Sequence, residues 1–256
     1  MEASPYHETF TLPAASEISD TPSQRLLIVL EEMMETAGRH AEILGVGVRD
    51  LHAKNLTWVL ARLHVQVEAL PEAGAQVRIV TWPAGRHRLF AVRDFQLQDA
   101  GGDELMRATS AWALMNLETR RPARLDPHLP VFSRHPGRMI VDDFSPLPSP
   151  HPGSARTWNR AEPGDIDIND HVNNTVYLDW ALRSAPGTAG SLAPSSLEAS
   201  FLAEARLGDR IACLTEIGCG GKSAILLQSL KDPASGRELT RLRTCWKTAD
   251  KLKKII

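Results

Sequence analysis

Residues 102–112, GDELMRATSAW, and residues 236–246, GRELTRLRTCW, share Gly, Glu, Leu, Arg and Trp at a constant offset of 134. A second pair, EAGAQVRI at 72–79 and EARLGDRI at 204–211, shares Glu, Ala, Arg and Ile at an offset of 132. Each match is weak alone, but their order and near-constant offset predict an internal repeat. We attribute the two-residue difference to a hairpin turn of different length. The chain is therefore expected to contain two copies of one supersecondary unit.

Each copy reads as one helix followed by a strand meander. In the first copy, apolar residues recur at helical spacing from Leu26 to Leu44, after the start signal Asp20-Thr21-Pro22. Runs rich in Val, Leu and Trp follow, with a hairpin turn in DAGGD, at 56–67, 75–84, 89–100 and 104–117. The second copy predicts a helix near Asn173–Arg183 and strands at 196–203, 209–219, 224–232 and 238–248.

A helix whose single apolar stripe is covered by one long antiparallel sheet is the arrangement of the hotdog fold. Two copies in one chain predict an α+β double hotdog. An α+β meander of unrelated topology is the alternative. We expect an N-terminal hotdog at 1–128, a proline-rich crossing at 129–153 and a C-terminal hotdog at 154–256.

The crossing is marked by proline, because 8 of the 17 prolines lie between Pro122 and Pro152. Such density breaks helices and strand ladders alike. We expect an ordered, irregular segment rather than a free linker, because it carries apolar anchors at Val131, Phe132, Met139, Ile140, Val141 and Phe144.

The composition predicts a globular protein with a packed core. The 256 residues are 43% hydrophobic and 23% charged with a net charge of −2, which argues against nucleic acid as the main partner. No apolar run is long enough for a membrane span, and MEASPYHETF has acids where a signal peptide has basic residues, so we expect a cytoplasmic protein that does not bind membranes. Cys213, Cys219 and Cys245 have no metal-binding spacing, and we expect no metal and no cofactor.

The densest polar segment runs from Arg160 to Trp180, RAEPGDIDINDHVNNTVYLDW. In an extended segment, Asp167, Asn169 and His171 would project to one side, just before the free amides of a helix N-terminus. An amide donor, a proton acceptor and an orienting carboxylate suit hydrolysis of a thioester. The alternative is that they are turn, capping and surface residues. The corresponding place in the first copy has only EISDTPSQR, which favours the functional interpretation.

These residues resemble a known family. DIDINDHVNNTVYLDW at 165–180 is similar to the signature of acyl-acyl carrier protein thioesterases, double-hotdog enzymes that end fatty acid synthesis. The resemblance extends to METAGRHAEILG at 34–45, NLTWVLARLHV at 55–65 and EARLGD at 204–209. It implies hydrolysis of acyl-carrier thioesters to free fatty acid and holo-acyl carrier protein.

The resemblance places the proposed catalytic residues of the family on Asp167, Asn169, His171 and Glu204. It leaves open whether Asp167 attacks the carbonyl or only orients other groups. Glu204 has a structural alternative as a turn residue, because Glu72 occupies the matching place in the first copy. Plant members have a Cys after this Glu, where this chain has Ala205, so a thiol nucleophile is not expected there.

The remaining residues of that segment have structural interpretations. We expect Asn173 and Asn174 to tie down the helix start, and Tyr177 and Trp180 to belong to the core. The three cysteines are expected to be small buried thiols.

The resemblance also implies that the first hotdog holds the acyl chain and the second performs hydrolysis. Candidate chain-binding residues are Met33, Met34, Trp58 and Leu60, with core packing as the alternative for each. Docking of an acidic carrier protein is expected to use exposed basic residues, either Arg86, His87 and Arg88 or Arg120, Arg121 and Arg124. The sequence leaves a homodimer open.

Two other functions are compatible with the fold. The first is an enzyme that takes coenzyme A thioesters or hydrates an enoyl group, although hydration would need a different acid–base pair. The second is a non-catalytic sensor of acyl thioesters that regulates transcription. Such a regulator would need a basic helix-turn-helix segment, which the residues before position 20 do not supply.

Overall fold

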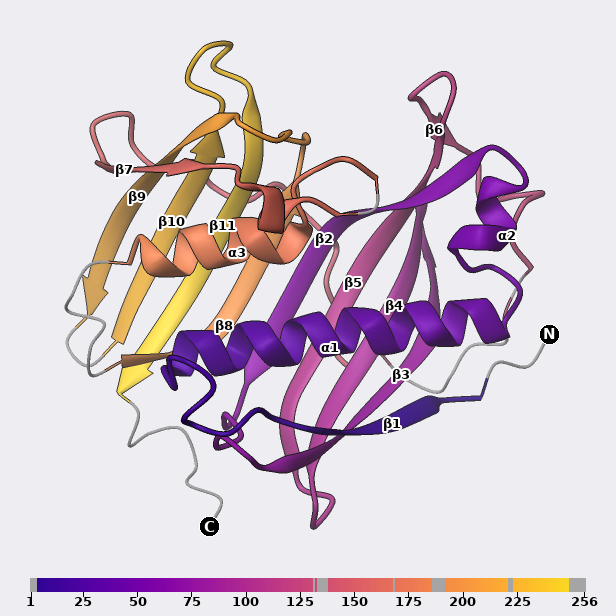
Figure 1. Cartoon of the computed structure of the whole chain (residues 1–256), viewed down its shortest axis with the longest axis horizontal. Helices are drawn as coiled ribbons and strands as arrows, with labels where there is room; N and C mark the ends of the chain where they lie inside the picture. Colours follow the sequence, from indigo (N-terminus) through magenta and orange to yellow (C-terminus); the bar gives the residue numbers. More distant parts are fainter. Residues whose placement is uncertain are drawn as a thin grey trace. The chain divides into compact units, whose positions relative to one another are not determined.

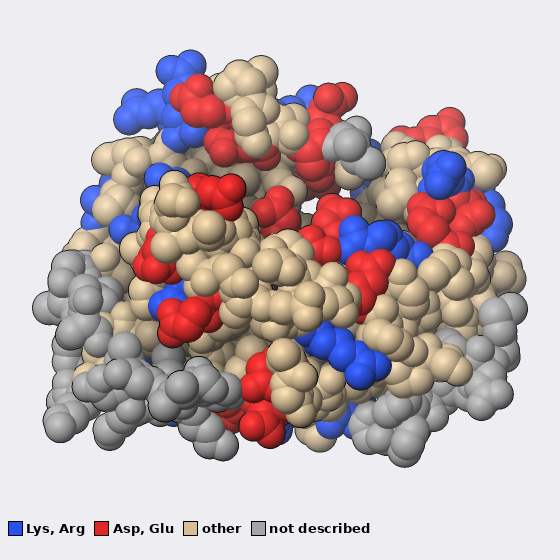
Figure 2. Space-filling model, turned by 60° about the horizontal axis from the view of Figure 1, so that its bottom comes forward, with Lys and Arg blue, Asp and Glu red and all other residues tan. Residues whose placement is uncertain are grey.

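The protein is described by a computed structural model at residues 4–130, 132, 138–167, 169–185, 192–220 and 223–248. These residues fall into two compact units. The first comprises Met1–Ile18, Ile28–Val65 and Pro71–Phe144, and the second comprises Ser19–Leu27, Gln66–Leu70 and Ser145–Ile256. Acidic and basic side chains are interspersed over the face drawn in Figure 2.

The first unit places a long helix across one face of an antiparallel sheet (Figure 1). Helix α1 (Pro22–Ile43) begins as expected at the proline, and the Thr21 hydroxyl accepts a hydrogen bond from the Gln24 N–H at 3.2 Å. The strands lie in the order β1-β3-β4-β5-β2. Their bounds are β1 Tyr6–Thr11, β2 Leu56–Val67, β3 Gln76–His87, β4 Phe90–Asp99 and β5 Glu104–Asn116; β6 (Pro122–Ala123) pairs with β5, and α2 spans Val48–His52.

The second unit repeats this arrangement around helix α3 (Asn174–Arg183). Its strands lie in the order β7-β9-β10-β11-β8, which matches the first unit strand for strand. The bounds are β7 Ala155–Arg160, β8 Leu192–Phe201, β9 Arg210–Gly220, β10 Ser223–Lys231 and β11 Glu238–Thr248, and a 3₁₀ turn lies at Pro163–Asp165. The chain is a double hotdog, and the alternative of an unrelated meander is wrong.

The meander expected from the sequence differs from the structure in two ways. Each unit has a six-residue strand before its helix, β1 (YHETFT) and β7 (ARTWNR), which the sequence analysis missed because both are mostly polar and exposed. The strand after each helix also pairs with the last strand of its unit rather than the next one. Hydrophobic pattern alone does not encode that choice of neighbour.

The structure corrects the offset of the repeat. The N–H of Gly74 donates to the Pro13 carbonyl and that of Gly208 to the Ala161 carbonyl, and both glycines have positive φ, at 78° and 84°. These equivalent turns lie 134 residues apart, so the offset of 132 and the hairpin invoked to explain it are wrong. Since β2 and β8 end at Val67 and Phe201, the same offset pairs Glu204 with Leu70, not with Glu72. The first copy therefore has no counterpart of the Glu204 carboxylate.

The last part of the crossing packs onto the first unit through a buried carboxylate. Asp94 on β4 accepts hydrogen bonds from the Thr109 hydroxyl at 2.7 Å and the Met139 N–H at 2.8 Å, and Arg138 forms an ion pair with it. Ile140 and Phe144 are buried, as expected of anchors. Among the other expected anchors, Phe132 is half-buried and packs on a core cluster, Val141 is 90% exposed and anchors nothing, and Val131 lies outside the described residues.

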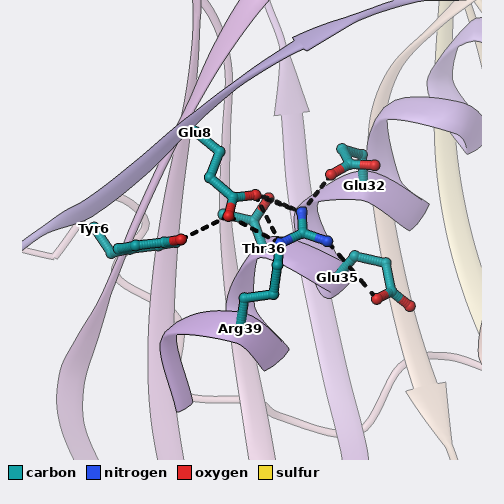
Figure 3. Close-up of polar contacts among 6 residues, drawn as sticks. All are labelled: Tyr6, Glu8, Glu32, Glu35, Thr36 and Arg39. Atoms are coloured by element: carbon teal, nitrogen blue, oxygen red, sulfur yellow. Dashed lines mark hydrogen bonds and ion pairs between the residues drawn. The ribbon is translucent and has the colours of Figure 1, made fainter. Parts of the chain in front are cut away.

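Strand β1 is held to helix α1 by a charged network (Figure 3). The Arg39 guanidinium pairs with the Glu8 and Glu32 carboxylates, and the Tyr6 hydroxyl donates to Glu8 at 2.6 Å. The Tyr6 ring also stacks on His40, with centroids 5.1 Å apart. The bonds from Arg39 lower the pKa of Glu8, so this contribution to stability is present above the unfolded pKa and lost as the pH falls through the folded one.

Replacement of Asp94 by Asn is expected to lower the free energy of unfolding by about 2–4 kcal/mol, because it removes the charge that pairs with Arg138 in a buried place. Urea denaturation at neutral pH measures this. The exposed Asp103→Asn is the control and should change the value by less than about 0.5 kcal/mol. Equal effects of the two substitutions would mean that Asp94 does not anchor the crossing.

Candidate active site

The polar segment before α3 is a closed turn rather than an extended strand. Ile166 and Val172 form an antiparallel bridge, and the Asp167 N–H donates to the His171 carbonyl at 2.8 Å. The chain reverses at Asp170, whose φ of 60° lies in the left-handed region that Asp tolerates. The expectation that Asp167, Asn169 and His171 line one side of an extended segment is therefore wrong.

The Asp167 carboxylate organises this turn from inside. Its Oδ1 accepts the backbone N–H of Asn169 at 2.8 Å and that of His171 at 3.4 Å. The Asn169 side-chain amide lies 3.4 Å from Oδ2 of the same carboxylate. Short side chains that accept backbone N–H groups two residues on are a common means of fixing a turn. Asp167 thus fixes the backbone on which Asn169 and His171 are presented.

His171 and Glu204 form a histidine–carboxylate pair in the site. The His171 Nε2 lies 3.1 Å from the Glu204 Oε2, and their side chains are 12% and 39% exposed. His171 belongs to the turn before α3, whereas Glu204 follows β8. A carboxylate at this distance can accept a hydrogen bond from the imidazole and so fix the orientation of the ring. The pair leaves the carboxylate partly open to solvent.

The backbone at Glu204 and Ala205 is fixed from three sides. The Ala205 N–H donates to the Tyr177 hydroxyl at 2.7 Å, and the Ala205 carbonyl accepts the Val172 N–H at 3.0 Å. The Arg237 guanidinium donates to the Glu204 carbonyl at 3.0 Å. These bonds tie the Glu204 loop to helix α3 and to the turn that carries His171. These backbone bonds therefore set the distance between the His171 imidazole and the Glu204 carboxylate.

Two of these supporting residues were missed as parts of the site. Tyr177 and Trp180 are buried as expected, but the Tyr177 hydroxyl reaches the backbone beside Glu204, and burial raises its pKa to about 12. A tyrosine on a buried helix face needs a partner for its hydroxyl, which is the signal that could have found it. Nothing in the sequence marks Arg237.

The start of α3 is capped by its own side chain. Asn173 is the N-cap and accepts the Thr175 N–H at 3.1 Å, which confirms its expected role. The N–H groups at the start of this helix were expected to be free to bind an oxyanion. The bond to Asn173 occupies one of them. The Asn169 side-chain amide donates to Asp167 and has a second N–H that can reach a ligand.

A second histidine–carboxylate pair lies in the first unit. The His64 Nδ1 is 2.7 Å from the Asp142 Oδ2, and both side chains are largely buried. Asp142 also accepts the Phe144 N–H at 2.6 Å, so its carboxylate helps to order the end of the crossing. This pair therefore has a structural explanation.

The expected chain-binding residues all lie in the first unit. Met33 and Leu60 are fully buried, and Met34 and Trp58 are half-buried. Trp58 packs against a cluster that contains Leu51 and donates from its indole nitrogen to the Val46 carbonyl at 2.9 Å. Core packing thus explains Trp58, and a role of these residues in holding an acyl chain stays a prediction.

The first expected docking group, Arg86, His87 and Arg88, is less exposed than expected. Arg86 pairs with Asp126 at 2.7 Å and donates to the Leu129 carbonyl, and His87 packs edge-on against Phe144. In that group only Arg88 is exposed; all of the second group, Arg120, Arg121 and Arg124, is at least partly exposed.

The described thiols are unsuited to nucleophilic attack. Cys213 is buried and Cys245 half-buried, and burial raises the pKa of both thiols. A raised pKa leaves less of the reactive thiolate at neutral pH. Cys219 lies in β9, and its side chain falls outside the described part of the structure.

Comparison with known families decides the relationship. Residues 5–130 match the model of the acyl-ACP thioesterase N-terminal domain, and residues 159–248 match that of the C-terminal domain. The chain belongs to the acyl-ACP thioesterase family. The pair of His171 and Glu204 lies in the part matched by the C-terminal acyl-ACP thioesterase domain.

Individual acyl-ACP thioesterases support this assignment. The palmitoyl-acyl carrier protein thioesterase of Cuphea hookeriana, named as chloroplastic, is 30% identical over 90% of this chain and 60% of its own length. The chain thus spans about 60% of the length of the first curated relatives that it matches. The 12:0-ACP thioesterase of Umbellularia californica superposes with a TM-score of 0.81 at 25% identity, covering 95% of this chain and 94% of that one. A Lactobacillus plantarum structure described as a putative oleoyl thioesterase, 20% identical with 96% and 97% coverage, shows the same fold at a TM-score of 0.80.

Among the described helices of this acyl-ACP thioesterase family member, none combines the length and apolar character of a membrane span.

The contact of Tyr177 with Ala205 can be tested on stability. Tyr177→Phe is expected to lower the free energy of unfolding by about 1–3 kcal/mol, because the buried Ala205 N–H loses its acceptor. The chain has 2 tyrosines, which gives a matched control: Tyr6→Phe removes a bond to Glu8 near the surface and should cost less than about 1 kcal/mol. Thermal and urea unfolding measure both values, and a Tyr177→Phe effect no larger than that of Tyr6→Phe would contradict the proposed fixation.

Proposed function

We propose that the protein hydrolyses acyl-acyl carrier protein thioesters to free fatty acid and holo-acyl carrier protein, the step that ends fatty acid synthesis. The observation that carries this proposal is the 3.1 Å contact between His171 and Glu204, in which His171 comes from the same turn as Asn169. The printed names of the relatives, palmitoyl- and dodecanoyl-acyl carrier protein thioesterases or hydrolases, support the substrate class.

The proposed reaction uses water as the nucleophile. Glu204 accepts a hydrogen bond from His171 Nε2, which leaves Nδ1 as the ring nitrogen that can take a proton. Water attacks the thioester carbon and gives its proton to the imidazole, while the carbonyl oxygen gains a negative charge. The Asn169 amide donates to that oxygen. Collapse of the intermediate breaks the C–S bond, and the thiolate leaves and takes the proton from His171.

We assign Asp167 an orienting role rather than direct attack on the carbonyl. Its Oδ1 is used by the backbone N–H groups of Asn169 and His171, and its Oδ2 faces the Asn169 amide. A carboxylate that accepts several N–H bonds is a weak nucleophile, because those bonds stabilise its charge. The first unit would hold the acyl chain through Met33, Met34, Trp58 and Leu60, which is the division of labour that the resemblance implies.

The proposed place of action is a reducing cytoplasm. The free thiols of Cys213 and Cys245 are compatible with it, whereas the plant relatives are named as chloroplastic. Fractionation of the source cells tests the location. Light scattering on the purified chain tests the homodimer that the sequence leaves open.

Loss of either member of the His171–Glu204 pair is expected to slow turnover strongly. His171→Ala and Glu204→Gln should each lower kcat on acyl-acyl carrier protein by roughly 10²-fold or more, with unchanged circular dichroism. Release of free fatty acid measures the rate. The matched controls are His64→Ala, which breaks the other histidine–carboxylate pair, and Glu72→Gln, and both should keep kcat within about three-fold if folded.

Three results would count against the proposal. Near-normal turnover by folded His171→Ala would mean that the active site is not at His171. A wild-type preference for acyl-coenzyme A over acyl-acyl carrier protein would mean that coenzyme A thioesters are the substrates. Accumulation of labelled acyl chain on the protein would restore Asp167 as the nucleophile.

Cysteine is not expected to take part. Replacement of Cys213, Cys219 and Cys245 together by Ala should retain hydrolysis, with a packing cost of about 1–3 kcal/mol in stability where a thiol is buried. Iodoacetamide should likewise leave the wild-type rate unchanged, because burial raises the pKa of the Cys213 and Cys245 thiols. If the folded triple variant releases no fatty acid, the water-based mechanism is wrong.

A further inference from the structure

Strand β7 lies at the edge of its sheet (Figure 1). The Thr157 hydroxyl bonds to Ser184 at the end of α3, at 2.6 Å, so alternate residues of the strand face away from that helix. Arg156, Trp158 and Arg160 are those residues, and all three are exposed. Arg210 on β9 lies directly opposite Arg160. We call these four residues the edge-strand patch.

The tryptophan of the edge-strand patch is flanked by two cations. Trp158 is 50% exposed, and the guanidinium carbons of Arg156 and Arg210 lie 5.8 Å and 4.9 Å from its ring centroid. Such distances are those of cation–π contacts, which hold the guanidinium groups over the ring while leaving their N–H groups free to bind. Trp and Arg are also the residues that most often dominate the energy of protein interfaces.

The arginines of the edge-strand patch lack acidic partners within the described residues. The side chains of Arg156, Arg160 and Arg210 form no ion pair or hydrogen bond there, whereas those of Arg183, Arg241 and Arg243 in the same unit pair with carboxylates. Like charges directly opposite on neighbouring strands, as at Arg160 and Arg210, are destabilising. Stability of the sheet therefore does not explain this arrangement, but attraction of an acidic partner does.

The edge-strand patch lies next to both loops of the candidate site. Strand β7 ends at Arg160 and leads through the 3₁₀ turn into the segment of Asp167 and His171. Strand β9 begins at Arg210, directly after the loop that carries Glu204. The backbones of these two connections are joined by the Gly208 N–H to Ala161 carbonyl bond at 2.9 Å. A partner seated on the patch would sit beside the loops of His171 and Glu204.

We propose that the edge-strand patch is the docking surface for an acidic carrier protein, with Trp158 as its apolar centre and Arg156, Arg160 and Arg210 as its charged contacts. This rests on the proposed function, because it assumes a substrate whose acyl thioester is tethered to such a protein. Charge complementarity supports this occupant. A polynucleotide would also be attracted to arginine, but the chain as a whole carries a net charge of −2.

The test separates docking from chemistry by using substrates with and without the carrier protein. Arg156→Glu/Arg210→Glu and Trp158→Ser are compared with Arg49→Glu/Arg78→Glu, which makes the same charge change at exposed arginines of the first unit. Steady-state rates are measured on acyl-acyl carrier protein and on acyl-pantetheine. Binding of unacylated holo-acyl carrier protein is measured by calorimetry, and folding by circular dichroism.

The Arg156→Glu/Arg210→Glu variant should raise KM for the carrier-bound substrate by about 10-fold or more and weaken holo-carrier binding equally. Its rate on acyl-pantetheine should stay within about two-fold, and so should all rates of the Arg49→Glu/Arg78→Glu control. Added salt should weaken wild-type binding more than that of the variant. If charge reversal impairs folding, Arg156→Gln/Arg210→Gln tests the same loss.

Equal effects of the two charge reversals, or unchanged carrier binding by the folded edge-strand variants, would overturn the proposal. Equally tight binding of a polynucleotide, lost in the same variants, would assign the surface to nucleic acid instead. Failure of the proposed function looks different. Holo-carrier binding would then depend on the patch, but no thioester would be hydrolysed.

Discussion

The candidate site depends on the two backbone hydrogen bonds of Ala205. Its N–H reaches the Tyr177 hydroxyl on α3, and its carbonyl receives the Val172 N–H from the turn before that helix. One residue therefore joins a helix, a turn and the loop after a strand. Because Ala205 is only 1% exposed, these hydrogen bonds are shielded from competing water. The separation of His171 and Glu204 follows from this junction rather than from any direct link along the chain.

The two units show how one frame supports different loops. Their strand orders agree, and their equivalent glycine turns lie 134 residues apart. The first copy of the repeat starts its helix after a Thr21 cap, whereas the second copy has a 3₁₀ turn and a closed loop before Asn173. The place of Glu204 is taken by Leu70 in the first copy of the repeat. The chemical difference between the copies thus lies in two short connections that the sheets do not need.

Periodicity and internal repeats made most of the fold predictable from the sequence. Both long helices and the eight long strands were found because their apolar residues recur at regular spacing. Strands β1 and β7 were missed because they are short and polar, and the turn at Asp170 was missed because a positive φ has no periodic signal. The repeat was aligned with an offset of 132 because residues 72–79 and 204–211 share Glu, Ala, Arg and Ile at that spacing. These identities are coincidental, because the loops that contain them differ in sequence. The side chain of Arg86 illustrates another limit, since it folds back onto Asp126 and two carbonyls.

The candidate site was predictable as a set of residue types but not as a geometry. The segment from Asp167 to His171 carries its own signal, because polar side chains are concentrated there in only one of the two copies. The pairing of His171 with Glu204 joins residues from separate loops, and no local pattern encodes such a contact. The support from Arg237 was invisible for the same reason, since its guanidinium reaches a backbone carbonyl 33 residues away in the chain.

The position of the crossing matters for anyone who wishes to exchange modules between members of the family. Asp94 takes its partners from Arg138 and Met139, which lie beyond the residue-128 boundary suggested by the proline pattern. In a hybrid joined at that boundary, the buried Asp94 carboxylate would come from one parent. The segment that supplies its ion-pair and hydrogen-bond partners would come from the other. A junction after Phe144, where the first compact unit ends, would instead keep Asp94 with its own Arg138 and Met139.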